Sequence, residues 1–343
     1  MFSLGFSVTN RRYLGNKNKL LFPIENVLSL CEGDSFIDLF GGTGTVTAHL
    51  LEKGGFYKRF VINDLLFSNE VIYKAFFGEG AWSSAKLNDY IEKNISSIEI
   101  DKIEENYFSK SYGDKYFKQS DALQIGYIRD ILERDRLNFT EKEFNIMLAS
   151  LIYSLDRCSQ TTGHYEAFMG KKDDKKSFVF QLVEPLAIES GTKVEIYRKD
   201  ANELVKDIEV DIAFLDPPYN SRDYGQYYHV LEQIVKWDKP ELFGKTAKPK
   251  GIVKSEYCSN SATKTFEELI EDLKVKYILV TYNNSFTTSA SSRNKISYED
   301  MVRILSNKGE LEIFENNYKA FNAGKTNIEG HKELIFFVKV KGK

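Results

Sequence analysis

The chain has few residues of the types that bind metals or form disulfides, and they are widely separated. Its 343 residues include three cysteines, an odd number, and four histidines. Cys31, Cys158 and Cys258 are too far apart for a local disulfide framework or a CxxC metal site. No two histidines have the i, i+4 spacing of a helical zinc site. We therefore expect a reducing compartment and no metal ion.

Long hydrophobic runs are also absent. The longest, such as residues 277–282, are far shorter than the roughly 20 residues that span a membrane. The apolar residues 1–8 precede the nearest basic residues, Arg11 and Arg12, whereas a secretory signal has the opposite order. With 42% hydrophobic and 28% charged residues, the composition is that of a soluble globular protein. The sequence predicts a cytoplasmic protein with about two domains, or one core carrying a large insertion.

The chain lacks the excess of basic residues that is typical of nucleic-acid-binding proteins, since its net charge is -3. Lysines and arginines nevertheless cluster at residues 11–19, 171–176 and 245–254. Such clusters occur on solvated surfaces as well as along phosphate backbones. They do not by themselves decide for or against nucleic acid.

A strand, a glycine turn and a helix follow one another near the N-terminus. Residues 35–40 form a short apolar segment that leads into Gly41-Gly42-Thr43-Gly44, and helical periodicity follows as far as Gly54. Glycines allow a sharp turn and a close approach of a ligand to the helix N-terminus. A second predicted strand at 60–62 leads to Asp64, where doubly wound folds hold ribose hydroxyls. The pattern favours a nucleoside-containing cofactor over a plain glycine turn with a surface aspartate.

The glycine spacing narrows the choice of cofactor. It matches neither GxGxxG nor GxxxxGK[ST], which argues against NAD and ATP. Asp38, beside the turn, suits a ligand with a positive ammonium group. S-adenosyl-L-methionine carries an ammonium group, a ribose and an adenine, and is the cofactor that we expect.

The tetrad Asp216-Pro217-Pro218-Tyr219 follows an apolar segment at 211–215. Two successive prolines stiffen the loop and hold the flanking side chains in place. The carboxylate and the Pro217 carbonyl can accept hydrogen bonds from an exocyclic amine, while Tyr219 can stack on the ring. Taken alone, the tetrad could equally be a proline turn capped by an aspartate. After a buried strand, and with the glycine turn, it predicts a pocket for a planar amine.

Three motifs together resemble the amino-methyltransferases that modify adenine in DNA. The tetrad is their DPPY, and Phe40, Gly42 and Gly44 match their FxGxG. The stretch Arg12-Tyr13-Leu14-Gly15-Asn16-Lys17 is similar to their N-terminal basic-aromatic motif. The motifs occur in the order of the alpha group, to which Dam-like enzymes belong. Residues 220–232 and 277–284 look like the methyltransferases of type IIS restriction-modification systems such as FokI.

The resemblance implies an α/β fold, with a Rossmann-like S-adenosylmethionine-dependent methyltransferase sheet, an antiparallel last strand and an inserted, mainly helical target-recognition domain. We expect the catalytic domain at 1–65 and 191–343 and the target-recognition insertion at 66–190. Further strands are expected at 194–200, 277–284, 310–314 and 333–340. Helices are expected in the insertion at 85–94, 125–136 and 141–155.

The resemblance also implies roles for particular residues. The expected catalytic residues are Asp216, Pro217, Pro218 and Tyr219. The expected cofactor-binding residues are Tyr13, Lys17, Asp38, Phe40, Gly42, Thr43, Gly44, Asp64, Leu65, Asp200, Ala201 and Asp216. The expected DNA-binding residues are Arg12, Gln160, Thr161, Thr162, His164, Tyr165, Asn220, Ser221 and Arg222.

The implied reaction is methylation of adenine N6 in double-stranded DNA, with the base flipped into the DPPY pocket. A cognate restriction endonuclease is the implied partner. Three alternatives stay open: an RNA adenine or protein glutamine methyltransferase, a cytosine amine methyltransferase, and a non-catalytic DNA-binding subunit. The aspartate at the first tetrad position argues against the glutamine and cytosine enzymes, which typically have asparagine and serine there. A fused endonuclease is not expected, because no PD-(D/E)xK-like cluster stands out.

Overall fold

The computed structural model describes residues 6–11, 13, 15, 17–161, 163–168, 176–283, 295–317 and 332–342. Contacts divide the chain into two compact units. We call them the sheet unit, Lys17–Leu65, Ile188–Tyr224 and Val253–Lys343, and the helical unit, Met1–Asn16, Leu66–Ala187 and Gly225–Ile252.

The sheet unit is built on a seven-stranded sheet with the order β3-β2-β1-β4-β7-β9-β8. Its first five strands in this order are parallel, and β9 runs antiparallel to both of its neighbours, β7 and β8. This confirms the predicted α/β class with an antiparallel last strand. The strands are β1 (Ser35–Asp38), β2 (Arg59–Asn63), β3 (Lys193–Tyr197), β4 (Ile212–Leu215), β7 (Tyr277–Asn283), β8 (Gly309–Asn317) and β9 (Lys332–Val340).

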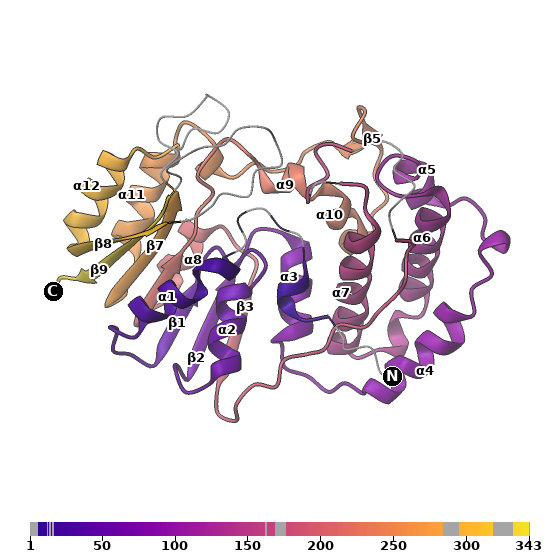
Figure 1. Ribbon diagram of the computed structural model, residues 1–343, viewed down its shortest axis with the longest axis horizontal. Coiled ribbons are helices and arrows are strands. Elements are labelled where there is room, and N and C mark those ends of the chain that lie inside the picture. The colour runs from indigo at the N-terminus through magenta and orange to yellow at the C-terminus, as the bar shows by residue number, and fades with distance from the viewer. Residues whose placement is uncertain are drawn as a thin grey trace. The chain divides into compact units, whose positions relative to one another are not determined.

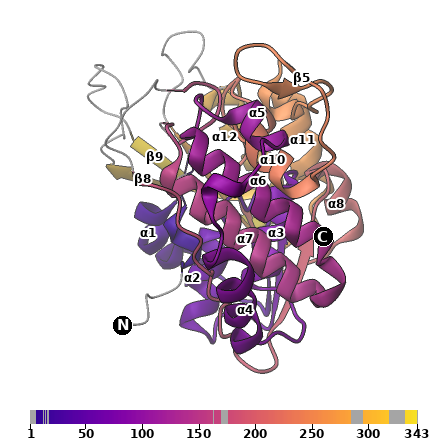
Figure 2. The same ribbon diagram turned by 90° about the vertical axis from the view of Figure 1, so that its right-hand side faces the viewer.

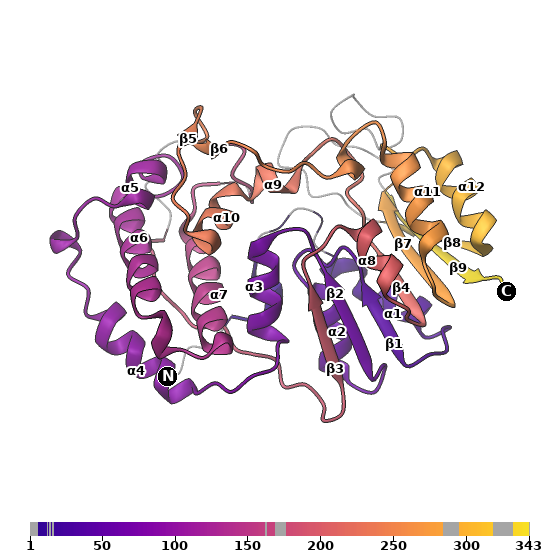
Figure 3. The same cartoon turned by 180° about the vertical axis from the view of Figure 1, so that it is seen from behind.

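Helices cover both faces of this sheet (Figures 1 and 3). One core lies between the strands and α8, α11 and α12, where Leu204, Phe266 and Leu305 are fully buried. The opposite face is covered by α1 and α2 (Figure 1). Strands β1, β2 and β4 are buried almost throughout, because parallel strands with helices on both faces have no solvent side. The helices are α1 (Leu21–Leu28), α2 (Thr45–Lys53), α8 (Ala201–Asp207), α11 (Ala262–Asp272) and α12 (Tyr298–Lys308).

The order of the strands indicates where a ligand-binding site lies. From β1 the chain crosses through α2 to β2 on one side, whereas β4 pairs with β1 on the other side. The loops after β1 and β4 therefore leave the sheet at neighbouring positions and diverge. In open α/β sheets this switch point, at the carboxyl ends of the strands, is where ligands bind.

The helical unit is organised around α7, which is buried along most of its length and packs against α3, α6 and α10 (Figure 2). A capping box between Thr140 and Glu143 begins α7. All three helices predicted in the insertion are present, with different bounds. The unit contains α3 (Phe67–Phe76), α4 (Ser84–Ile91), α5 (Tyr107–Tyr112), α6 (Gln119–Arg134), α7 (Glu141–Cys158), most of α9 (Tyr224–Tyr227), α10 (His229–Lys236), β5 (Leu242–Phe243) and β6 (Lys248–Pro249).

Short helical turns complete the secondary structure. A π-helical turn, Glu92–Ser96, continues α4. The 3-10 turns are Val8–Asn10, Asn18–Leu20, Ile100–Lys102, Arg136–Asn138 and Glu256–Cys258. In the part of the chain that the structure describes, no helix has both the length and the apolar character to cross a membrane.

The two contact units are divided at other positions than the predicted domains, which stay a prediction, and residues 188–190 group with the sheet unit. Residues 225–252 belong to the helical unit, because α10 packs against α3 and α7. The first 16 residues also belong to it, since Phe6 donates its N–H to the Leu182 carbonyl and Tyr153 donates to the Val8 carbonyl. Both segments contact residues of this unit that are distant from them in sequence, and local sequence patterns do not reveal such contacts.

Candidate active site

The glycine turn after β1 has the backbone conformation that the sequence predicts. Gly42 and Gly44 have φ angles of 53° and 74°, in the left-handed region that favours glycine. The Asp64 carboxylate accepts a hydrogen bond from the Gly42 N–H at 3.0 Å. The end of β2 therefore holds the turn that connects β1 to α2.

Asp38, the last residue of β1, is a buried acid with an unsatisfied oxygen. The Thr47 hydroxyl donates to its Oδ2 at 3.0 Å, while Oδ1 has no hydrogen-bond partner among the described residues. Burial raises the pKa of this carboxyl to about 7. A buried carboxylate oxygen without a partner is costly unless a ligand donates to it.

The other expected cofactor residues of the sheet unit lie at the carboxyl ends of β1, β2 and β3. Phe40 packs edge-on against Tyr257, with ring centres 5.1 Å apart. Asp200 caps α8 by accepting from the N–H groups of Asn202 and Glu203. Thr43 and Ala201 are buried, and Leu65 is exposed. Tyr13 lies in the helical unit, where it stacks on Tyr228 at 4.5 Å.

The tetrad lies directly after β4, and two side chains hold its aspartate. The ammonium of Lys17 is 2.9 Å from Asp216 Oδ2, and the Thr281 hydroxyl on β7 donates to Oδ1 at 2.8 Å. Lys17 also donates to the Tyr219 hydroxyl at 3.2 Å. The resemblance implied only cofactor binding for Lys17. The structure pairs it with the tetrad, so Lys17, the last residue of the N-terminal motif, and DPPY form one cluster.

Burial and charge act against each other in this cluster. Burial raises the pKa of Asp216 above its usual value, although Lys17 and Thr281 favour the carboxylate. For Lys17 burial opposes the charge, but the attraction of Asp216, Tyr219 and Glu333 together outweighs burial and raises the pKa well above the usual value. The lysine therefore stays charged across the physiological range.

Tyr282 on β7 holds the tetrad residue Tyr219 in place. The Tyr219 ring packs edge-on against Tyr282, with centres 5.4 Å apart, and the Tyr282 hydroxyl donates to the Tyr219 carbonyl. After the tetrad, Ser221 and Arg222 are exposed. Asn220 accepts the Arg222 N–H on its side-chain oxygen, and the Cys258 thiol donates to the Arg222 carbonyl. The loop is thus ordered while its polar side chains face solvent.

Sequence reasoning missed two polar residues near the tetrad. Thr281 stands in a buried strand segment, and Glu333 is a buried acid near the start of β9. Each could have been found from the sequence as a polar residue at a position of a predicted strand where the side chain faces inward. In the residues that the structure describes, no group of three or more histidine, cysteine, aspartate or glutamate side chains could hold a metal ion.

The expected DNA-binding residues that the structure describes between 160 and 165 lie in the helical unit. Gln160, Thr161 and Tyr165 are each less than 5% exposed. His164 is partly exposed and stacks on Tyr227 at 4.6 Å. Direct contact of the three buried side chains with DNA would require this segment to open. Arg12 and Thr162 lie outside the described residues.

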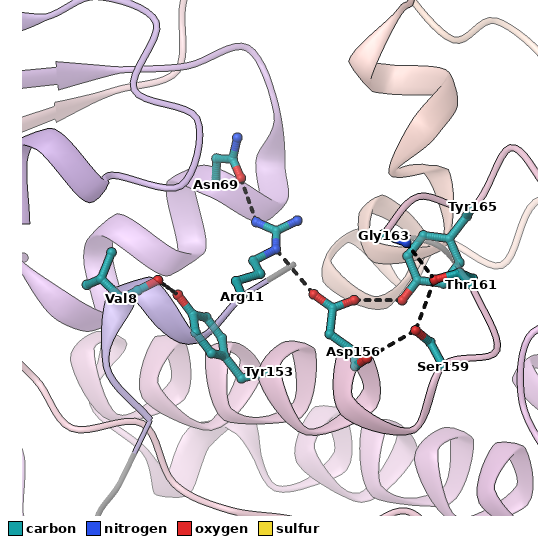
Figure 4. A network of polar contacts seen from close by, with 9 residues as sticks. All are labelled: Val8, Arg11, Asn69, Tyr153, Asp156, Ser159, Thr161, Gly163 and Tyr165. Carbon is teal, nitrogen blue, oxygen red and sulfur yellow. Dashed lines mark hydrogen bonds and ion pairs between the residues drawn. The ribbon is translucent and has the colours of Figure 1, made fainter. Parts of the chain in front are cut away.

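A buried arginine joins this segment to the N-terminal residues (Figure 4). Arg11 approaches Asp156 at 3.4 Å and donates to Asn69 at 2.9 Å, while Tyr165 donates to the same Asp156 carboxylate at 2.7 Å. The guanidinium also lies over the rings of Tyr13 and Tyr228. This network connects the residues before α3 with the end of α7.

We expect Arg11→Met to destabilise the helical unit by about 3–5 kcal/mol, because it leaves the Asp156 charge buried without its cation. Urea unfolding monitored by far-UV circular dichroism measures the change. Lys93→Met is a suitable control, since its ion pair with Asp89 is exposed and contributes little. Equal unfolding midpoints for the two variants would contradict a stabilising role of the Arg11 network.

The fold and the arrangement of the two loops are those of a Rossmann-like methyltransferase. The sequence profile of the D12 class N6 adenine-specific DNA methyltransferases matches residues 13–286. The chain belongs to this family.

Named modification enzymes are similar along nearly the whole chain. The type II methyltransferase M.NlaIII of Neisseria lactamica is 30% identical over 332 residues, covering 93% of this chain and 95% of that protein. M.CviAII of Paramecium bursaria Chlorella virus 1 is 31% identical over 339 residues, covering 96% and 98%. M.FokI of Planomicrobium okeanokoites is 30% identical over 351 residues, covering 95% of this chain but 52% of that protein. The chain thus spans about half the length of M.FokI, and likewise 55% of the modification methylase LlaI.

Proposed function

We propose that this chain transfers a methyl group from S-adenosyl-L-methionine to N6 of adenine at a short, specific sequence in double-stranded DNA. The observation that supports it most is the Asp216 carboxylate, held at the end of β4 by Lys17 and Thr281. The tetrad stands beside the glycine turn at the switch point of the sheet. Donor and acceptor sites would then be neighbours, as direct transfer requires.

The residues around the glycine turn fit S-adenosyl-L-methionine. The cofactor supplies a methyl group made electrophilic by a positive sulfur. The Asp38 oxygen that has no partner among the described residues would accept its ammonium, and the turn without side chains at Gly42 and Gly44 would let the cofactor approach α2. Asp64, which follows β2 and holds the Gly42 N–H, would accept hydrogen bonds from the ribose hydroxyls.

The tetrad residues would prepare the amine. Asp216 and the Pro217 carbonyl would each accept a hydrogen from N6 of a flipped adenine, and Tyr219 would stack on its ring. These bonds pull the nitrogen toward tetrahedral geometry and localise its lone pair for attack. Flipping the base costs a few kcal/mol, which stacking and backbone contacts offset.

The helical unit would recognise the target sequence. Ser221 and Arg222 are exposed beside the tetrad, where they would contact the DNA backbone. Because M.NlaIII and M.FokI are type II methyltransferases, we infer that this chain is the modification enzyme of a restriction-modification system with a cognate endonuclease. We place it in the cytoplasm, where its free cysteines stay reduced.

Binding of S-adenosyl-L-methionine is expected to strengthen by roughly eightfold between pH 6 and pH 7.5. The pKa of Asp38 is about 7, so its carboxyl is mostly protonated at pH 6 and mostly ionised at pH 7.5. Only the ionised form attracts the ammonium. Isothermal titration calorimetry without DNA measures the affinity, and Asp38→Asn should bind weakly with no such pH dependence. The same pH dependence in the Asn variant would remove Asp38 from the cofactor site.

The function is tested by modification-sensitive sequencing of DNA from a methylation-deficient bacterial host that expresses the chain. We expect N6-methyladenine within one short motif, absent from a host that expresses Asp216→Ala. Methylation elsewhere than in a defined motif, or methylation that survives the substitution, would contradict the proposal. An asymmetric motif would support the similarity to the type IIS enzymes.

A further inference from the structure

The ion pair between Lys17 and Asp216 creates an electrostatic difficulty for the proposed reaction. Methyl transfer to a neutral amine places a positive charge on that amine until a proton leaves. Asp216 would stabilise this charge, but the ammonium of Lys17 lies only 2.9 Å away and balances it. A neutral pair attracts a developing cation much less than a free carboxylate does.

A second carboxylate lies on the same face of the sheet as the residue that holds Asp216. In the pairing of β7 with β9, Thr281 is opposite Ile335 and Asn283 is opposite Glu333. Alternate residues of a strand share a face, so Glu333 lies on the face of Thr281, whose hydroxyl binds Asp216. Glu333 is 9% exposed, and its Oε2 has no hydrogen-bond partner within the described ranges.

Glu333 also interacts electrostatically with the ion pair. Burial raises the pKa of Glu333, Lys17 acts to lower it and Asp216 to raise it. In return Glu333 favours the charged form of Lys17. Lys17 therefore interacts electrostatically with two carboxylates, and with both acids ionised the three groups together carry a net charge of one negative unit.

We propose that Glu333 is a positioning residue that shares the charge of Lys17, so that Asp216 can stabilise the positive charge on the N6 amine. This inference rests on the role proposed above for Asp216. It gives a residue at the start of β9 a role in the reaction, although this residue belongs to neither the tetrad nor the glycine motif.

The charge balance of methyl transfer explains why a second carboxylate is needed in addition to Asp216 and Lys17. The N6 lone pair forms the new nitrogen–carbon bond, and the carbon–sulfur bond breaks with its electrons remaining on sulfur. The amine then carries one positive charge, which the negative cluster neutralises. One N6 proton next passes to the Asp216 carboxylate, and the product amine is neutral. Without the Glu333 charge, the same step would leave a buried positive charge uncompensated.

The test compares Glu333→Gln with Glu333→Asp. We expect Glu333→Gln to lower kcat by roughly ten- to a hundredfold, the effect of one charge acting over several ångströms at an effective dielectric constant of about 20. The KM for S-adenosyl-L-methionine, its Kd by calorimetry, DNA binding by mobility shift and the Tm should stay near the wild-type values. Glu333→Asp keeps the charge and should recover a large part of kcat. Glu312→Gln removes an exposed acid from β8 and should leave kcat unchanged.

Two results would overturn the inference. One is a wild-type kcat for Glu333→Gln. The other is an equal loss in the Gln and Asp variants together with a lower Tm, which would mean that Glu333 only supports folding. The Asp216→Ala variant separates this inference from the proposed function. If Asp216→Ala is inactive and Glu333→Gln is fully active, only the role of Glu333 fails. If Asp216→Ala is active as well, the proposed catalytic centre fails with it.

Discussion

Asp216→Ala is expected to abolish methyl transfer, with a loss in kcat on the order of 10³-fold or more. The variant loses both the acceptor for the N6 hydrogen and the charge that opposes the developing cation. Specific DNA binding should remain, because the exposed residues after the tetrad and the helical unit are unchanged. Single-turnover transfer of a radiolabelled methyl group, together with a mobility-shift titration, measures the two properties separately.

The alanine variant needs a control for folding. It leaves the ammonium of Lys17 buried without its carboxylate, which destabilises proteins by about 3–5 kcal/mol. Asp216→Asn also removes the carboxylate from Lys17, but it keeps the volume and one acceptor oxygen, so it should destabilise the fold less than alanine and yet be nearly inactive. Appreciable turnover by a folded Asp216→Asn variant would mean that the carboxylate charge is not required.

Lys17→Met should lower kcat at pH 7 by roughly 30-fold and move the acid side of the pH profile to higher pH. The direction of this pH shift follows from the groups that act on the pKa of Asp216. Lys17 stabilises the ionised form of Asp216 and acts to lower its pKa, whereas burial raises it. Without Lys17 the effect of burial is unopposed, the pKa of Asp216 rises further, and less carboxylate is ionised at pH 7. Activity should therefore recover in part as the pH is raised.

The measurement is kcat from pH 5.5 to pH 9, at saturating cofactor and DNA. Lys19→Met serves as the control, because Lys19 is exposed in the same segment and should leave the profile unchanged. A uniform loss of activity at all pH values would show that Lys17 acts through packing or cofactor binding and does not tune Asp216.

Local patterns predicted most of the elements that build the site. The strands at 35–40 and 211–215 are short apolar runs, and the glycines between β1 and α2 are required by their backbone conformation. Such features depend on residues close in sequence, which is why sequence alone reveals them.

The partners of Asp216 could not be predicted in this way. Lys17 and Tyr219 are 202 residues apart, and only the folded sheet brings them together. The polar character of Gln160 and Thr161 suggested surface residues, yet both are buried, and the Thr161 hydroxyl is hydrogen-bonded to the Ser159 hydroxyl at 3.2 Å. A polar residue that finds a partner inside the protein cannot be distinguished by composition from one that contacts a ligand.

The position of β9 has a consequence for how the chain folds. Because β9 lies between β7 and β8, the earlier strand β8 has no place in the sheet until residues 332–340 have been synthesised. Until then β7 is an open edge, with backbone groups free to pair with another chain. A polypeptide released before residue 332 would therefore keep that edge and be prone to aggregate. Assembly in this region must run against the order of synthesis, which favours a slow final step.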